Sequence, residues 1–130
     1  MQIVESFKVL TTLSAYRVVE MAAAAQTVQY PADLRGLPVG ITLDTVKDTV
    51  SSIPVAMNGI AKLYMNDTCT VGEIVASDTS GRGVPHAFAA TSTASTLASA
   101  YVGILAGPTV AATGTTSLIV INPGYLRGSV

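Results

Sequence analysis

Few side chains in this sequence are equipped for catalysis, and the first to consider is the single histidine, His86. It stands in the largely apolar segment Val84–Phe88, and a Ser-His-Asp or Cys-His arrangement would have to use it. The sequence contains no G-x-S-x-G nucleophile elbow. We therefore expect His86 to be a strand or loop residue that takes part in no reaction. The alternative, a small hydrolase, is excluded if a His86→Ala variant behaves as the wild type.

The single cysteine, Cys69, follows Asp67 and Thr68 in a segment expected to be a turn. A reactive thiol needs a basic neighbour or a helix N-terminus to lower its pKa, and the adjacent sequence offers neither. With one cysteine and one histidine, a zinc site built from these residue types is excluded. Cys69 is predicted to be a small turn or core residue.

The eight carboxylates are scattered along the chain, and most fall in predicted turns, where Asp is favoured because it hydrogen-bonds nearby backbone. The segment Gly81-Arg82-Gly83 is too short for a phosphate-binding loop and indicates a turn with an exposed arginine. The sequence thus predicts no catalytic residue, no metal site, no cofactor and no small-molecule substrate. The carboxylates are Glu5, Glu20, Asp33, Asp44, Asp48, Asp67, Glu73 and Asp78.

Composition narrows the class of protein further. The chain has 130 residues, of which 49% are hydrophobic and only 12% charged, with a net charge of −1. Disorder requires the opposite balance, and nucleic-acid binding requires a basic excess, so neither is expected. The longest apolar stretch, Leu97–Ala106, is about half the roughly 20 residues of a membrane span, and the start of the chain lacks the basic and apolar regions of a signal peptide. We expect a compact domain, not bound to membrane, with part of its surface covered by partners.

The residues that would position any site are organised as short strands. Val, Ile and Thr account for 40 of the 130 residues, and β-branched types favour strands. Glycine and proline punctuate the runs, which is typical of a small β-barrel or β-sandwich of short antiparallel strands. The predicted strands are 16–21, 27–30, 37–43, 52–57, 60–65, 73–76, 84–89, 99–105 and 116–121.

Two turn signals shape this prediction. Asn58-Gly59 lies between two apolar runs and is a strong hairpin signal, because both residues tolerate a positive φ. Asn122-Pro123-Gly124 is expected to end the last strand. The expected organisation is an arm or first strand over 1–15, one β domain over 16–124, and a loose tail over 125–130.

A short pattern occurs twice. Val39-Gly40-Ile41 is repeated as Val102-Gly103-Ile104, and each copy is followed, after a polar connector, by an apolar strand that leads to Asn and then Gly, Ile53–Gly59 and Leu118–Gly124. A glycine inside a strand weakens it, so its repetition indicates a bend or a close backbone approach, as at a barrel corner.

The middle and end of the chain resemble the small capsid cement, or head decoration, proteins of tailed bacteriophages. The resemblance covers about residues 35–122 and is carried by short strand-and-turn patterns, while the start, the Ser/Thr-rich 91–99 and the tail depart from it. The segments that carry it are Leu37–Leu43, Ser52–Met65, Val71–Val75, Asp78–Val84 and Tyr101–Ala106.

This resemblance implies a structural virion protein rather than an enzyme. It implies a homotrimer on the outer surface of the capsid that contacts the major capsid protein, bridges its subunits and stabilises the shell. Weak charge agrees with a position away from packaged DNA. An alternative is a non-catalytic surface β-sandwich that binds a receptor or a carbohydrate.

Residues 2–13 precede the matched region and have three alternative structures. An extended arm could add a strand to a neighbour's sheet, the segment could be the first strand of the domain, or residues 3–25 could form an amphipathic helix, although β-branched pairs lower its propensity. Alternating residues would give an arm one apolar face. The candidate capsid contacts are Ile3, Val4, Phe7, Val9 and Leu10.

Overall fold

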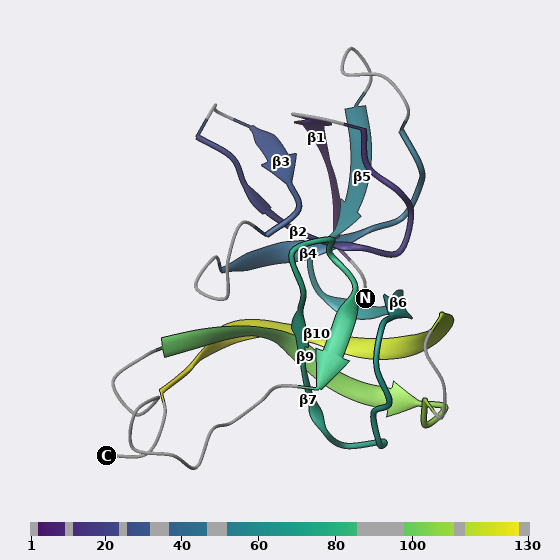
Figure 1. The fold of residues 1–130 in the computed structure, drawn as a ribbon. Helices are drawn as coiled ribbons and strands as arrows, with labels where there is room; N and C mark the ends of the chain where they lie inside the picture. The colour runs from purple at the N-terminus through teal and green to yellow at the C-terminus, as the bar shows by residue number, and fades with distance from the viewer. Residues whose placement is uncertain are drawn as a thin grey trace.

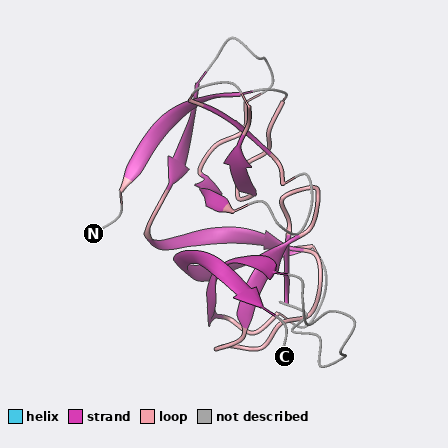
Figure 2. Cartoon of the chain, turned by 90° about the vertical axis from the view of Figure 1, so that its left-hand side faces the viewer, coloured by secondary structure: helices cyan, strands magenta, loops and turns pink. Residues whose placement is uncertain are grey.

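The fold is all-β, as predicted. The computed structural model describes residues 3–9, 12–23, 26–31, 37–46, 52–85, 98–110 and 114–127, and within these ranges the regular elements are strands, with no helix (Figure 2). The strands form two closed sheets of five strands each. In Figure 1 the first barrel lies above the second.

The first barrel is built from the first half of the chain, in the spatial order β1-β3-β2-β4-β5. Strand β1 returns to β5, which closes the sheet. The strands are β1 (Val4–Val9), β2 (Val18–Met21), β3 (Thr27–Gln29), β4 (Pro38–Thr42) and β5 (Ser52–Ala56).

The second barrel follows in the order β6-β8-β7-β9-β10, and β10 closes it by pairing with β6. The strands are β6 (Gly59–Met65), β7 (Ile74–Ser77), β8 (Gly83–Pro85), β9 (Ala98–Gly107) and β10 (Thr115–Arg127).

The two barrels are copies of one topology. Each starts with a strand that pairs in parallel with the third strand of its half and antiparallel with the fifth, and all other ladders are antiparallel. The repeated glycines occupy the same place in both copies. A Cβ on Gly40 would overlap the carbonyl of Ala56 in β5, and one on Gly103 would overlap the carbonyl of Val120 in β10. The close backbone approach predicted from the repeat is confirmed.

The correspondence extends to connections that the sequence does not repeat. An isolated antiparallel bridge outside the named strands occurs at the same place in each half, Leu13 with Val46 in the first and Cys69 with Val110 in the second. A residue with positive φ follows each bridge, Tyr16 in one copy and Gly72 in the other. The backbone carries the duplication while the side chains differ.

The Asn58-Gly59 hairpin prediction is wrong. Gly59 does have a positive φ of 79°, but β5 and β6 pair with other strands and belong to different barrels. The dipeptide joins the two copies of the repeat. A local turn signal cannot tell a hairpin from a change of sheet, because the strand partners are chosen by long-range packing.

The end of the second barrel also differs from the prediction. Strand β10 continues through Asn122-Pro123-Gly124 to Arg127 with a register shift between Ile121 and Gly124. Proline is tolerated where a bulge interrupts the ladder. Residues 125–127, expected in a loose tail, pair with 98–100 of β9.

The N-terminal segment is the first strand of a barrel, one of the three alternatives. Strand β1 pairs along its length with β5 and, at Lys8 and Val9, with β3, so this segment is neither a helix nor an extended arm over Val4–Val9. Its inward-facing residue, Val9, is buried.

Two apolar clusters hold the molecule together. One fills the first barrel and includes Val19, Val28 and Ile53. The other fills the second barrel but also takes in Ile41 and Ala56 of the first, so it extends across the contact between the barrels. This contact between the two barrels, here called the joint, is therefore part of a hydrophobic core.

Candidate functional site

The lone cysteine is a core residue, as predicted. Cys69 is 2% exposed and belongs to the cluster of the second barrel. Burial, with a smaller effect of the charges of Glu73 and Asp67, raises the pKa of its thiol from 9.0 to about 11. At neutral pH the group is a protonated thiol and a poor nucleophile. His86 lies outside the described residues.

Asp78 organises the turn that contains Gly81 and Arg82, as expected for an aspartate in a turn. Its Oδ1 accepts hydrogen bonds from the backbone N–H groups of Ser80 and Arg82, each at 2.9 Å. Its Oδ2 accepts one from Arg82 Nε at 2.9 Å and one from Asn66 Nδ2 at 3.1 Å. The carboxylate is fully engaged in shaping the loop, which leaves it poorly suited to proton transfer.

The described residues contain neither a metal-binding cluster nor a membrane-spanning helix. Within the residues that the structure describes, no group of three or more His, Cys, Asp or Glu side chains is placed to hold a metal ion. The described ranges likewise contain no helix that is long and apolar enough to cross a membrane. Exposed apolar side chains, by contrast, occur on both barrels.

The predicted capsid-contact residues separate into two groups. Ile3 and Val4 are exposed. Phe7 is half-buried and packs against the core of the first barrel, and Val9 is buried in it. Leu10 lies outside the described residues. Among the four candidates that the structure describes, Ile3 and Val4 are the pair with a large exposed apolar side chain.

A row of cross-strand neighbours runs over the outer face of each barrel. In the first barrel this first row consists of Val4, Ala56, Ile41 and Val18. The second row occupies the same ladder positions of the second barrel and consists of Ile60, Val120, Ile104 and Ile74. Outward-facing apolar residues of this kind need a covering surface or remain in contact with water.

Three of the four residues of the first row are covered by the second barrel, whereas Val4 is 42% exposed. Val18, Ile41 and Ala56 are completely buried and belong to the same apolar cluster as the interior of that barrel. Strand β4, which carries Ile41, lies against β6, β9 and β10. In Figure 1 it lies across the top of the lower sheet.

Polar contacts reinforce this joint beside the first row. The guanidinium of Arg17 lies over the ring of Tyr64, 4.7 Å from its centroid, and Arg17 Nη1 donates to Ser80 O at 3.1 Å. The backbone N–H of Tyr64 donates to Tyr16 O at 2.8 Å, and that of Val18 donates to Gly81 O at 2.7 Å. The glycine at 81 permits this approach, since a Cβ there would lie 2.7 Å from Val18 O.

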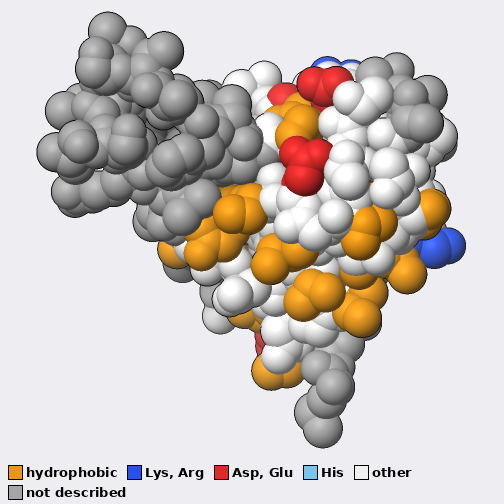
Figure 3. Space-filling model, turned by 90° about the horizontal axis from the view of Figure 1, so that it is seen from below, with side chains coloured by type: hydrophobic (Ala, Val, Ile, Leu, Met, Phe, Trp, Pro, Cys, Tyr) orange, Lys and Arg blue, Asp and Glu red, His pale blue; other side chains and the backbone are white. Residues whose placement is uncertain are grey.

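The second row lies on the surface. Ile60 is 54% exposed, Ile104 42% and Val120 41%, while Ile74 is half-buried. Hydrophobic side chains gather over the underside of the second barrel, with few charged groups among them (Figure 3). The positions of Ile41 and Ala56, which are core in the first barrel, are thus held in the second barrel by the exposed Ile104 and Val120.

Comparison with solved structures relates the fold of this chain to that of a known protein. The chain is similar to the protein in "The crystal structure of head fiber gp8.5 N base in bacteriophage phi29", with a TM-score of 0.66 and 17% sequence identity over 94% of this chain and 95% of the other. The two proteins share a fold. No protein-family model and no curated protein sequence matches the chain.

The resemblance to phage head decoration proteins, predicted from strand-and-turn patterns, is thereby confirmed at the level of the fold. The match covers 94% of this chain and so extends beyond residues 35–122, to which the sequence resemblance was limited. At this low identity it supplies no residue-level assignment.

The second row was missed by reasoning from sequence. Ile60 and Val120 lie far apart along the chain and meet only through the register of β6 with β10. The one available signal was the repeated Val-Gly-Ile, which places Ile104 at the position of Ile41. It did not reveal that one copy is covered and the other exposed.

Proposed function

We propose that this chain is a structural protein of a bacteriophage head that binds the outer surface of the capsid as a homotrimer. In this role it contacts the major capsid protein, bridges neighbouring subunits and stabilises the shell without catalysing a reaction. The observation that carries the proposal is the fold similarity, over nearly the whole chain, to a protein that forms the base of a phage head fibre.

The surface of the molecule supports this role. Among the residues that the structure describes, nine large hydrophobic side chains are at least 41% exposed, and only 12% of the residues of the full chain are charged. Protein partners cover such surfaces, whereas nucleic acid selects Lys and Arg. The described carboxylates include one, Asp78, that is committed to a turn, and the buried thiol is protonated. These features favour binding over chemistry.

For the capsid contact we propose Ile3 and Val4, the exposed pair among the candidate residues of the N-terminal segment. They lie at the start of β1, and the backbone N–H of Ile3 donates to Asn58 Oδ1 at 2.6 Å. This bond fixes the pair beside the connection between the barrels, which makes it a rigid contact rather than a loose arm.

The proposal is tested by mixing the purified protein with capsids that lack it, followed by sedimentation and electron microscopy. We expect co-sedimentation at a fixed ratio, density on the outer surface, and capsids that open at a higher temperature than undecorated ones. A protein that stays in the supernatant at every concentration would refute the proposal.

Point variants refine this experiment, since deletion of residues 2–13 would remove β1 and unfold the first barrel. An Ile3→Lys, Val4→Lys double variant is expected to lower capsid occupancy at least tenfold while retaining its fold and oligomeric state. The matched control is Val71→Lys, a change at an exposed apolar residue in a turn of the second barrel. Equal occupancy for both proteins would overturn the assignment of Ile3 and Val4.

A further inference from the structure

The kind of partner that fits the second row is indicated by a contact within the molecule, the one that covers the equivalent residues of the first row. In its counterpart, the first row, Val18, Ile41 and Ala56 are buried against a barrel of the same topology. The second row repeats this covered face in apolar character and in strand position. The exposed side chains of the second row continue a pattern that the chain already uses once.

We infer that the second row docks on the first barrel of a second copy of this chain. Ile74, Ile104 and Val120 would then take the place in this contact that Val18, Ile41 and Ala56 take at the joint within one chain. The inference rests on the homotrimer in the proposed function and names the contact that forms it. Because one barrel gives the row and the other receives it, the contact is head-to-tail.

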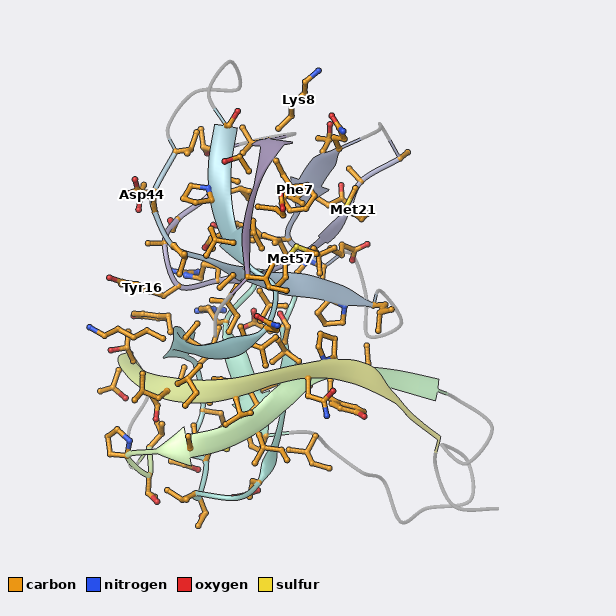
Figure 4. All side chains as sticks on the ribbon, turned by 180° about the vertical axis from the view of Figure 1, so that it is seen from behind. Phe7, Lys8, Tyr16, Met21, Asp44 and Met57 are labelled. Carbon is orange, nitrogen blue, oxygen red and sulfur yellow. The ribbon has the colours of Figure 1, made fainter. Side chains whose placement is uncertain are left out.

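The receiving side of the first barrel is found by the same correspondence. At the joint, Val102 and Ile121 of the second barrel are buried in one cluster with the first row. Val102 precedes Gly103, and Ile121 follows Val120. The equivalent residues of the first barrel are Val39, which precedes Gly40, and Met57, which follows Ala56. Val39 and Met57 are only partly buried, so additional apolar surface is available there. Met57 is labelled in Figure 4, close to the junction of the barrels.

Charge supplies an independent observation. Arg17 stands before Val18 of the first row and lies over Tyr64 of β6. The residue equivalent to Arg17 is Glu73, which precedes Ile74 of the second row. The residue equivalent to Tyr64 is Lys8, near the end of β1. Glu73 and Lys8 are both exposed. The cation–π pair within the chain thus corresponds to an opposite-charge pair between copies.

The backbone sets a limit on this correspondence. At the joint the N–H of Tyr64 donates to the first barrel, but the N–H of Lys8 already donates to Gln26 O at 2.8 Å within its own barrel. The contact between copies is therefore made by side chains, with no strand continued from one copy to the next. In Figure 4 the Lys8 side chain extends away from the second barrel, where a second copy can reach it.

The test is the mass of the isolated full-length chain, measured by light scattering and sedimentation velocity over a series of concentrations. We expect a closed oligomer whose mass stays constant, and an Ile104→Lys variant that sediments as the 13.3 kDa chain. Val71→Lys carries the same charge change at an exposed apolar residue outside the second row and should leave the mass unchanged. A monomeric wild type, or an oligomeric Ile104→Lys variant, would overturn the inference.

Charge reversal tests which surfaces meet. Lys8→Glu and Glu73→Lys should each weaken association by about tenfold, and the double variant should restore it, because the pair is re-formed with its signs exchanged. Circular dichroism and thermal unfolding establish that each variant is folded. A double variant as weak as the two single changes combined would refute the pairing of Lys8 with Glu73.

These results separate the inference from the proposed function. Wild-type chains that are monomeric in solution but decorate capsids would refute the contact between copies and leave the capsid role intact. Chains that form the oligomer but ignore capsids would do the reverse.

Discussion

The two barrels have the same strand order and the same ladder directions, yet they solve the problem of an apolar outer face differently. The first buries three of the four residues of its row against the second barrel, and the second leaves three of its four exposed. The conserved features are those of the backbone, such as Gly40 and Gly103, whereas side chains at equivalent positions differ. In this duplicated fold the apolar face of the first barrel is covered by the second barrel of the same chain, whereas the equivalent face of the second barrel is not covered within the chain.

The largest effect is expected where the two barrels are most alike. Gly40→Ala or Gly103→Ala would drive a methyl group into a carbonyl of the facing strand, Ala56 or Val120, and we expect each to cost at least about 3 kcal/mol of unfolding free energy. Denaturant titration measures this cost. The control is Gly72→Ala, which has open space for a Cβ and costs only about 1–2 kcal/mol through its positive φ. Equal losses at all three positions would show that collision is not the cause.

The next effect separates the barrels. Ile41→Ala removes a completely buried side chain at the joint and should cost about 2–5 kcal/mol. Ile104→Ala is the identical change at the equivalent exposed position and should cost the monomeric unit less than about 0.5 kcal/mol. Unfolding in denaturant at a low protein concentration gives both values. Similar losses would contradict the asymmetry between the rows.

A smaller effect concerns the turn that reaches across the joint. Gly81→Ala places a Cβ 2.7 Å from Val18 O and 2.8 Å from Tyr30 Cδ1 at a φ of 76°, and should cost about 1–3 kcal/mol. The equivalent turn of the first barrel has Gln26 with a φ of 55°. Gln26→Gly there should change stability by less than about 1 kcal/mol. Thermal unfolding of the two variants tests whether close packing at the joint, rather than φ alone, requires glycine.

The smallest effect is one of pH and concerns Cys69, whose counterpart in the first barrel is Leu13. The unfolded chain ionises this thiol near its ordinary pKa of 9.0, and the folded chain only near a pKa of about 11. Between these values the unfolded state binds fewer protons, so the free energy of unfolding falls as the pH rises. Reactivity toward an aromatic disulfide should therefore reach half its maximum near pH 11 in native protein. A midpoint near 9 would contradict burial of the thiol.

Much of the fold could be predicted from local patterns. Alternation and β-branched content located most of the strands, including Pro38–Thr42 and Gly59–Met65 nearly to their ends. The repeated Val-Gly-Ile identified the close approach at both glycines, since only a glycine fits against a facing carbonyl. These are short-range properties, and short-range patterns encode them directly.

The pairing of the strands and the candidate site could not be predicted in this way. Asn58-Gly59 has the dihedral preference of a hairpin and serves as a junction, because strand partners are decided by which faces pack together. The second row is assembled from four strands of the second barrel that meet only through their long-range pairing. Ile41 and Ile104 look the same in sequence, and only the position of the other barrel makes one core and the other surface.

Closure of both sheets has a consequence for a protein that carries so little charge. Chains of low net charge repel one another weakly, so they can aggregate when their unpaired edge strands hydrogen-bond to each other. Here the first and last strands of each five-stranded sheet are hydrogen-bonded to one another, which removes that route to amyloid-like growth. Contacts are left to side-chain patches of limited extent. We expect such a chain to avoid strand-to-strand aggregation even at high local concentration and to associate through these patches.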